Sequence, residues 1–236
     1  MVQTKPQDIT PRSLARKRTI LLEASKAFRE KGFHATGMRD IAARLDVTVG
    51  SLYYYFNNKE ELLIFCQEDT LLRLESYVAW IDDLGLRPDT RLHALISSHV
   101  ACLNVGTRGS LAHLEVPESD TPENRALLRK RSHYRRVLGE VIEEGIQRGI
   151  LETPEPRLAV MAILGAVNWT VRWYQAKGDR SPREIGESFA DQLVQGLLAP
   201  GIKLERPVLQ WPGFELAAPS VPSLESANLD KGMDDD

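Results

Sequence analysis

The chain has 236 residues, of which 42% are hydrophobic and 27% charged, enough length and apolar content for one large domain or a small domain joined to a larger one. Its ordinary glycine and proline content excludes a fibrous or wholly disordered protein. No apolar run approaches the length of a membrane span and residues 1–18 lack the apolar core of a signal peptide, so the composition predicts a soluble cytoplasmic protein without membrane partners.

The net charge of −3 hides a segregation along the chain. Up to Lys59 there are 11 basic and 5 acidic side chains, a balance of +6, whereas residues 202–236 carry 3 basic and 7 acidic ones, a balance of −4. A basic first quarter suits a polyanionic partner such as a nucleic acid, and an acidic tail does not.

The first predicted elements are an arm and a helix. Residues 1–11 carry no periodic pattern and are predicted to form a flexible arm. Apolar residues at helical spacing predict a helix from Pro11 to Lys31, which Gly32 ends.

Two short amphipathic helices follow, separated by a tight turn. The first is capped by Thr36 or Gly37 and runs to about Leu45, and the second is capped by Thr48. On the second helix, one face is predicted to be buried and carries Leu52, Tyr55 and Phe56, and the other is free for a partner and carries Gly50, Tyr53 and Tyr54. Such a helix-turn-helix is typical of proteins that read DNA.

Residues 32–63, GFHATGMRDIAARLDVTVGSLYYYFNNKEELL, resemble the TetR/AcrR family of transcriptional regulators through both helices and the start of the next. The resemblance implies a three-helix DNA-binding domain, then a helical domain for ligand binding and dimerisation. It implies no enzyme activity, and a homodimer that binds a partly palindromic double-stranded DNA operator. It favours a repressor that a small molecule releases.

The resemblance also implies individual DNA contacts. Four residues occupy positions that contact the DNA backbone in this family: Thr36, Thr48, Tyr53 and Lys59. Four others occupy positions that face base edges or adjacent phosphates: Arg39, Val49, Ser51 and Tyr54. Because Val49 and Tyr54 replace more polar residues or histidine, we expect fewer hydrogen bonds to bases and more contact with thymine methyl groups.

Three alternatives about this region stay open. Tyr53 and Tyr54 either face the DNA or pack partly on the first helix, and Gly50 either allows close approach to a groove or is a packing glycine. The basic residues at the start of the first helix are either a solvated surface or an arm for a flanking minor groove; they are Arg12, Arg16, Lys17 and Arg18.

The rest of the chain reads as helices and loops without strand patterns. A fourth helix starts at Asn57 or Asn58 and ends near Asp83, and residues 84–89 form a break. Further helices are predicted at Leu92 to Gly106, Leu111 to Val116, Glu123 to Gly149, Glu155 to Lys177 and Pro182 to Leu198. The sequence therefore predicts an all-α protein of about nine helices.

The predicted domain organisation has four parts. Residues 1–11 are the arm, 12–58 the DNA-binding domain, 59–199 the ligand-binding and dimerisation domain, and 200–236 a proline-rich acidic tail that is largely disordered or loosely draped. Within that tail, Trp211, Phe214 and Leu216 are candidates to anchor one point.

The segment NWTVRWY gives the clearest candidate ligand site. Helical spacing brings one cation beside two aromatic rings and an amide, in the set Asn168, Trp169, Arg172 and Trp173. This group either holds an anionic or planar ligand head, or its tryptophans pack in a dimer seam formed by the last two helices.

Residues 168–197 also resemble, less specifically, the C-terminal pattern of TetR-family regulators that respond to acyl-CoA thioesters. A group of cations on the preceding long helix is either a solvated face or a surface for CoA phosphates; its members are Arg125, Arg129, Lys130, Arg131, Arg135 and Arg136. A multidrug- or aromatic-compound-responsive regulator of efflux genes is the close alternative, and a non-specific architectural DNA-binding protein is the alternative from another class.

Catalytic and metal motifs are absent from the sequence. We find no nucleophile elbow, zinc-protease motif, Walker loop or dinucleotide fingerprint, and predict no cofactor. The cysteines are predicted to be buried reduced thiols, and the histidines to lack a shared metal site; they are Cys66, Cys102, His93, His99, His113 and His133.

Overall fold

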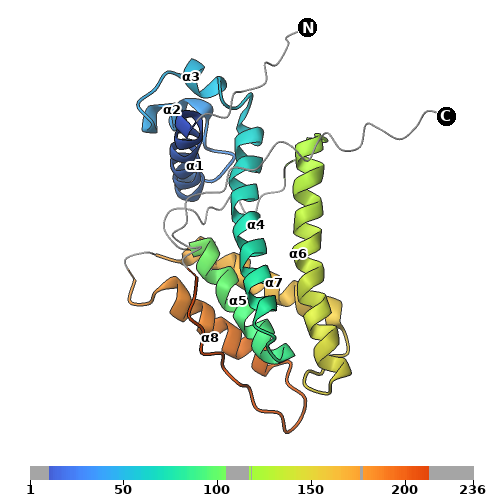
Figure 1. Ribbon diagram of the computed structural model, residues 1–236. Coiled ribbons are helices and arrows are strands. Elements are labelled where there is room, and N and C mark those ends of the chain that lie inside the picture. The colour runs from blue at the N-terminus through green and yellow to red at the C-terminus, as the bar shows by residue number, and fades with distance from the viewer. Residues whose placement is uncertain (1–10, 105–116, 118, 176–177, 213–236) are drawn as a thin grey trace, which may run out of the picture.

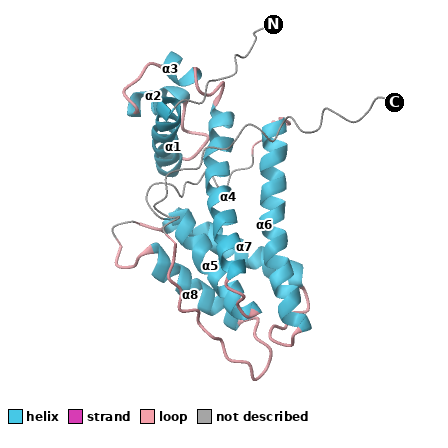
Figure 2. Cartoon of the chain, viewed as in Figure 1, coloured by secondary structure: helices cyan, strands magenta, loops and turns pink. Residues whose placement is uncertain are grey.

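A computed structural model describes residues 11–104, 117, 119–175 and 178–212 of the chain. In this part all regular elements are helices, without a strand (Figure 2). The eight helices are α1 (Pro11–Lys31), α2 (Met38–Arg44), α3 (Val49–Tyr53), α4 (Lys59–Asp83), α5 (Pro88–Asn104), α6 (Pro122–Gln147), α7 (Pro156–Trp173) and α8 (Pro182–Gln195). The all-α prediction is confirmed, and the extra helix expected at 111–116 lies outside the described residues.

Side-chain caps explain where several helices begin. Asn58 accepts a hydrogen bond from the Glu61 backbone N–H at the start of α4, and Thr121 does the same for Asn124 in α6. Ser181 and Glu184 form a reciprocal capping box at α8. α5 begins at Pro88, inside the predicted break, because proline is compatible with a first helical turn.

Helices α1 to α3 pack together at one end of the molecule, and α4 runs from them to α5, α7 and α8 (Figure 1). We call residues 11–66, which include the first two turns of α4, the head, and the remaining described residues the body. The head core is formed by apolar side chains of all four helices, among them Phe28, Ile41, Leu52, Phe56 and Leu63.

The body has a larger core in which α5 is the central helix. Every residue of α5 except the half-buried Arg91 is buried, and the helix packs against α4, α6, α7 and α8. α8 approaches α5 tightly at Gly186, where a Cβ atom would lie 2.6 Å from the Ser97 carbonyl oxygen. Since α4 contributes side chains to both cores, it is the covalent link between head and body.

Residues 200–212 pack on the surface of the body, which matches the draped alternative for this part of the tail and the candidate anchor Trp211. Glu205 pairs with Arg87 at 2.9 Å, and Arg206 with Asp191 at 2.8 Å. The Trp211 ring lies 5.5 Å from that of Trp80. Aromatic and ionic partners on the body therefore fix this segment, a long-range effect that its proline-rich composition does not reveal. Residues 213–236, with Phe214 and Leu216, lie outside the described residues.

Two further observations concern expected absences. No helix in the described residues is long and apolar enough to cross a membrane. Cys66 and Cys102 are buried thiols, as predicted, and the Cys102 thiol donates to the Thr70 carbonyl at 3.8 Å. The described residues contain no group of histidine, cysteine and carboxylate side chains suited to a metal ion.

Candidate DNA interface and effector site

The turn between α2 and α3 is built from local hydrogen bonds. The Asp46 and Val47 backbone N–H groups donate to the Ala43 and Ala42 carbonyls at 3.2 and 3.1 Å, and the Thr48 hydroxyl accepts from the Ser51 N–H at 3.1 Å. Asp46 takes the left-handed conformation, with φ of 52°, in the sharp reversal between the helices. These contacts fix the angle at which α3 leaves α2.

Helix α3 has the buried and exposed faces that its sequence predicts. Leu52 and Phe56 are buried in the head core, and Tyr55 is half-buried beside them. On the opposite side, Tyr53 and Tyr54 expose 49% and 70% of their surface. This exposure favours the DNA-facing alternative for both tyrosines over packing on α1.

A shallow depression of about 620 Å³ brings together the start of α2, α3 and the start of α4. Five of the eight predicted DNA-contact residues line it: Thr36, Arg39, Val49, Tyr53 and Lys59. Arg39 is exposed, and no residue in the described part of the chain pairs with its guanidinium. The remaining three, Thr48, Ser51 and Tyr54, are exposed on α3 nearby.

Two of these residues have structural tasks that the sequence did not indicate. Thr36 is buried, and its hydroxyl donates to the Ala27 and Gly32 carbonyls at 3.2 and 2.7 Å, so the geometry does not support a phosphate contact by this side chain. The Lys59 ammonium donates to the Phe33 and His34 carbonyls at 2.8 and 3.3 Å. It ties the α1–α2 turn to α4, and one of its three N–H groups remains for an outside acceptor.

Gly50 is exposed on α3. A Cβ atom there would meet only Thr48 Oγ1, at an ordinary 3.8 Å. No packing constraint among the described residues therefore requires glycine, which leaves close approach of a partner as the better explanation.

The predicted ligand group on α7 is divided between two faces of the helix. The Asn168 side chain points into the body and accepts from His99 Nε2 at 2.9 Å. Trp169 and Trp173 expose 56% and 44% of their surface, and Arg172 is exposed with no described residue pairing with it. The structure therefore does not bring the four residues together in one site.

The sequence did not indicate a row of hydrogen-bonded side chains inside the body. His99 Nδ1 accepts from the Tyr134 hydroxyl at 3.0 Å, and the Asn104 amide donates to the Thr170 hydroxyl at 2.7 Å. Burial lowers the pKa of His99 to about 4 and raises the pKa of Tyr134. This row joins α5, α6 and α7 through a neutral imidazole.

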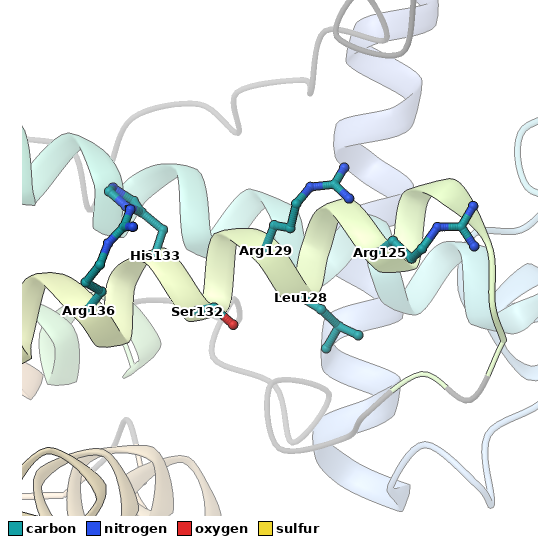
Figure 3. A pocket seen from close by; sticks show the side chains of 6 residues that line it. All are labelled: Arg125, Leu128, Arg129, Ser132, His133 and Arg136. Carbon is teal, nitrogen blue, oxygen red and sulfur yellow. The ribbon is translucent and has the colours of Figure 1, made fainter. Parts of the chain in front are cut away.

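The six cations on α6 also separate in space. Lys130 and Arg131 face α4, where they contact Glu68 at 3.4 Å and Gln67 at 2.7 Å. Burial lowers the pKa of Arg131. The outer side of α6 has an open depression of about 790 Å³ lined by Arg125, Leu128, Arg129, Ser132, His133 and Arg136 (Figure 3). Figure 3 shows Arg125, Arg129 and Arg136 extending from the helix on the side opposite Leu128 and Ser132.

Comparison with family models gives a consistent result over both regions. The model described as bacterial regulatory proteins of the tetR family matches residues 20–64. The model described as the C-terminal domain of tetracyclin-repressor-like proteins matches residues 85–197.

Individual relatives match most of the chain. It is 24% identical over 192 residues to the HTH-type transcriptional repressor KstR2 of Mycolicibacterium smegmatis, covering 80% of this chain and 94% of that protein. The structure of the ketosteroid transcriptional regulator KstR2 of Mycobacterium tuberculosis superposes with a TM-score of 0.68, at 23% identity over 83% of this chain and 97% of that one. AibR, solved in complex with isovaleryl coenzyme A and operator DNA, superposes with a TM-score of 0.65, at 26% identity over 78% and 99%.

Proposed function

Because the chain belongs to the TetR family of bacterial regulatory proteins, we propose that it is a ligand-responsive repressor that binds a partly palindromic operator as a dimer. The observation that carries this proposal is the exposed face of α3, with two tyrosines beside the unpaired Arg39. An exposed polar and aromatic helix face next to an arginine that no described residue pairs with suits a major groove flanked by phosphates. Residues 12–58 would bind DNA in the cytoplasm, and residues 59–199 would bind the effector and the second copy.

Dimerisation is proposed through α7 and α8. Large apolar side chains are exposed along one side of α7, namely Leu158, Met161, Trp169 and Trp173. The Trp173 ring stacks on Phe189 of α8, with centroids 6.1 Å apart. Exposed apolar side chains along α7, one of them stacked on half-buried Phe189 of α8, support an interface between copies. If sedimentation at micromolar concentration shows only the 26.5 kDa monomer, the proposed dimer is contradicted.

For the effector we propose an acyl-CoA thioester. The isovaleryl coenzyme A complex of AibR supports this class. Arg129 and Arg172 support it too, because both are exposed, no described residue pairs with them, and arginine binds phosphate groups well. The polar side chains buried between α5, α6 and α7 offer hydrogen-bonding groups near the middle of the body.

Fluorescence anisotropy tests the proposal. A labelled fragment from upstream of the gene is titrated with protein at fixed salt, and isovaleryl-CoA, longer acyl-CoAs and the matching free acids are then added separately. Release by a thioester but not by its acid supports the effector class. If the protein binds the fragment specifically but no thioester changes the binding, the proposal of a repressor stands and the effector class becomes uncharged aromatic or drug-like compounds. Equal affinity for the fragment and for scrambled DNA would contradict operator recognition.

A further inference from the structure

α4 packs into both cores and links the head to the body. A second contact away from the axis of α4 would further restrict bending of the head relative to the body. In a dimeric repressor, such bending would change the distance and angle between two recognition helices. A contact of this kind would therefore affect how the two heads fit an operator.

Such a contact joins the last turn of α1 to the C-terminal end of α7. The Arg29 Nη2 group donates to the backbone carbonyl of Tyr174 at 2.7 Å, across 145 positions of sequence. The Arg29 guanidinium carbon also lies 5.7 Å from the centre of the Tyr174 ring. Tyr174 is buried and Arg29 is half-buried, so the contact is partly shielded from water.

The local structure of α7 explains why an arginine binds there. Tyr174 is the C-terminal cap, with its N–H bonded to Thr170 O at 2.9 Å. Its backbone has left the helical conformation, with ψ of 133°. The last carbonyls of a helix have no partner within the helix and carry its partial negative charge, which favours an external cation. Burial lowers the pKa of Arg29, a sign that this cation has given up part of its hydration for the contact.

A second, smaller contact supports the same arrangement. The Glu60 carboxylate, in the first turn of α4, accepts from the Ser119 backbone N–H at 2.8 Å, just before α6. The head is thus held by the ends of two body segments besides α4. Tyr174, the partner of Arg29, comes directly after the exposed residues Arg172 and Trp173 in the sequence.

We propose that Arg29 is a positioning residue, which sets the orientation of the head through Tyr174 and thereby the operator half-site spacing that the dimer accepts. The inference rests on the proposed function, because it assumes a dimer that binds two half-sites. Arg29 itself touches no DNA in this scheme. Its contact with the end of α7 couples the effector-binding body to the head directly, in parallel with α4.

The first test compares Arg29→Met with a matched control, Arg44→Met. Arg44 pairs with Glu30 inside the head and touches nothing in the body, so its loss removes an arginine without releasing the head. The duplexes are the sequence selected by the wild-type protein and versions with the half-sites moved by single base pairs, each shift being about 3.4 Å along and about 35° around the helix.

We expect the wild-type protein and Arg44→Met to prefer one spacing by about tenfold or more, and Arg29→Met to lose most of that preference. Arg29→Lys, which keeps a cation, should recover part of it. A merely destabilised head would lower affinity equally for every spacing. An Arg29→Met protein that discriminates as the wild type does would overturn the inference.

The second test needs neither DNA nor effector. Spin labels at Ala43→Cys and Gln195→Cys, both exposed positions, report the distance between head and body within one chain, since Cys66 and Cys102 are buried. Labelled chain is diluted with unlabelled chain. Arg29→Met should broaden the distance distribution and Arg44→Met should not. An unchanged distance distribution in Arg29→Met would overturn the inference, even if the protein proves to be an operator-binding repressor. If the wild-type protein does not bind DNA specifically, the spin-label result still stands and only the proposed function is contradicted.

Discussion

In the head, α1 to α3 enclose an almost wholly apolar core and carry their ion pairs on the surface, whereas the body buries an ion pair and a row of hydrogen-bonded side chains between its helices. The head pairs, such as Arg44 with Glu30, are exposed to water that screens them. The pair formed by Arg73 and Asp69 on α4 is almost fully buried, at 3.0 Å. An arginine–carboxylate pair is therefore expected to matter more for stability in the body than in the head.

The proposed function accounts for this difference. A DNA-binding surface must keep its cations in water until phosphates replace that water, so the interior beneath it can be apolar. A body that responds to a ligand benefits from internal groups with more than one hydrogen-bonding arrangement, at the cost of burying polar atoms that need partners. Four predictions test this contrast, beginning with the largest effect.

Asp69→Ala should lower the free energy of unfolding by about 3–5 kcal/mol, because it leaves the Arg73 cation buried without its carboxylate. Arg44→Ala, which breaks the exposed pair in the head, should change it by less than about 1 kcal/mol. Urea denaturation followed by circular dichroism measures both. The double variant Asp69→Leu with Arg73→Met should recover much of the loss, and similar costs for the two single alanine variants would remove the contrast.

Acid should weaken the body through His99. Its folded pKa of about 4 lies below the 6.5 of an ordinary histidine, so the folded protein favours the neutral imidazole and the unfolded chain takes up the proton first. Stability from this group is complete above pH 6.5 and falls as the pH drops toward 4, by up to about 3 kcal/mol. His99→Gln should flatten the pH dependence of urea midpoints over that range; the same slope in the variant would contradict this.

Two glycines on helices should respond in opposite ways. Gly186→Ala places a Cβ 2.6 Å from the Ser97 carbonyl oxygen, and should lower stability by about 1–3 kcal/mol by forcing α5 and α8 apart. Gly50→Ala has room and should preserve or slightly raise stability while weakening binding to operator DNA. Thermal unfolding and anisotropy together separate the effects. If Gly50→Ala binds DNA like the wild type, close approach at this position is not required.

The smallest effect should come from single phosphate contacts. Arg39→Ala and Tyr53→Phe should each weaken binding by about 1 kcal/mol across specific and scrambled duplexes. The loss of the Arg39 charge should also reduce the slope of log affinity against log salt by about one, because fewer counterions are released. Arg129→Ala, a cation of the body, is the control and should leave that slope unchanged. Slopes that match in all three variants would contradict the assignment of Arg39.

The sequence by itself determined the helices and their faces. Caps such as Thr48 and Asn58 act within one turn, and the apolar residues of α3 recur with the helical period, so both are local signals. The same holds for Tyr53 and Tyr54, whose exposure follows from their phase relative to Leu52. A motif that extends over both short helices is also sufficient to indicate the family.

Tertiary structure decided which partner each face meets. Periodicity places Asn168 and Trp169 side by side on α7, but only the packing of α5 shows that the amide turns inward to His99 while the indole stays exposed. Thr36 and Lys59 occupy positions that the family motif assigns to DNA contacts. In the fold, however, the Thr36 hydroxyl and the Lys59 ammonium donate to backbone carbonyls of the head. The contact of Arg29 with Tyr174, like the packing of Trp211 on α4, joins residues far apart in the chain. No local period encodes such contacts, because they depend on the angles at which whole helices cross.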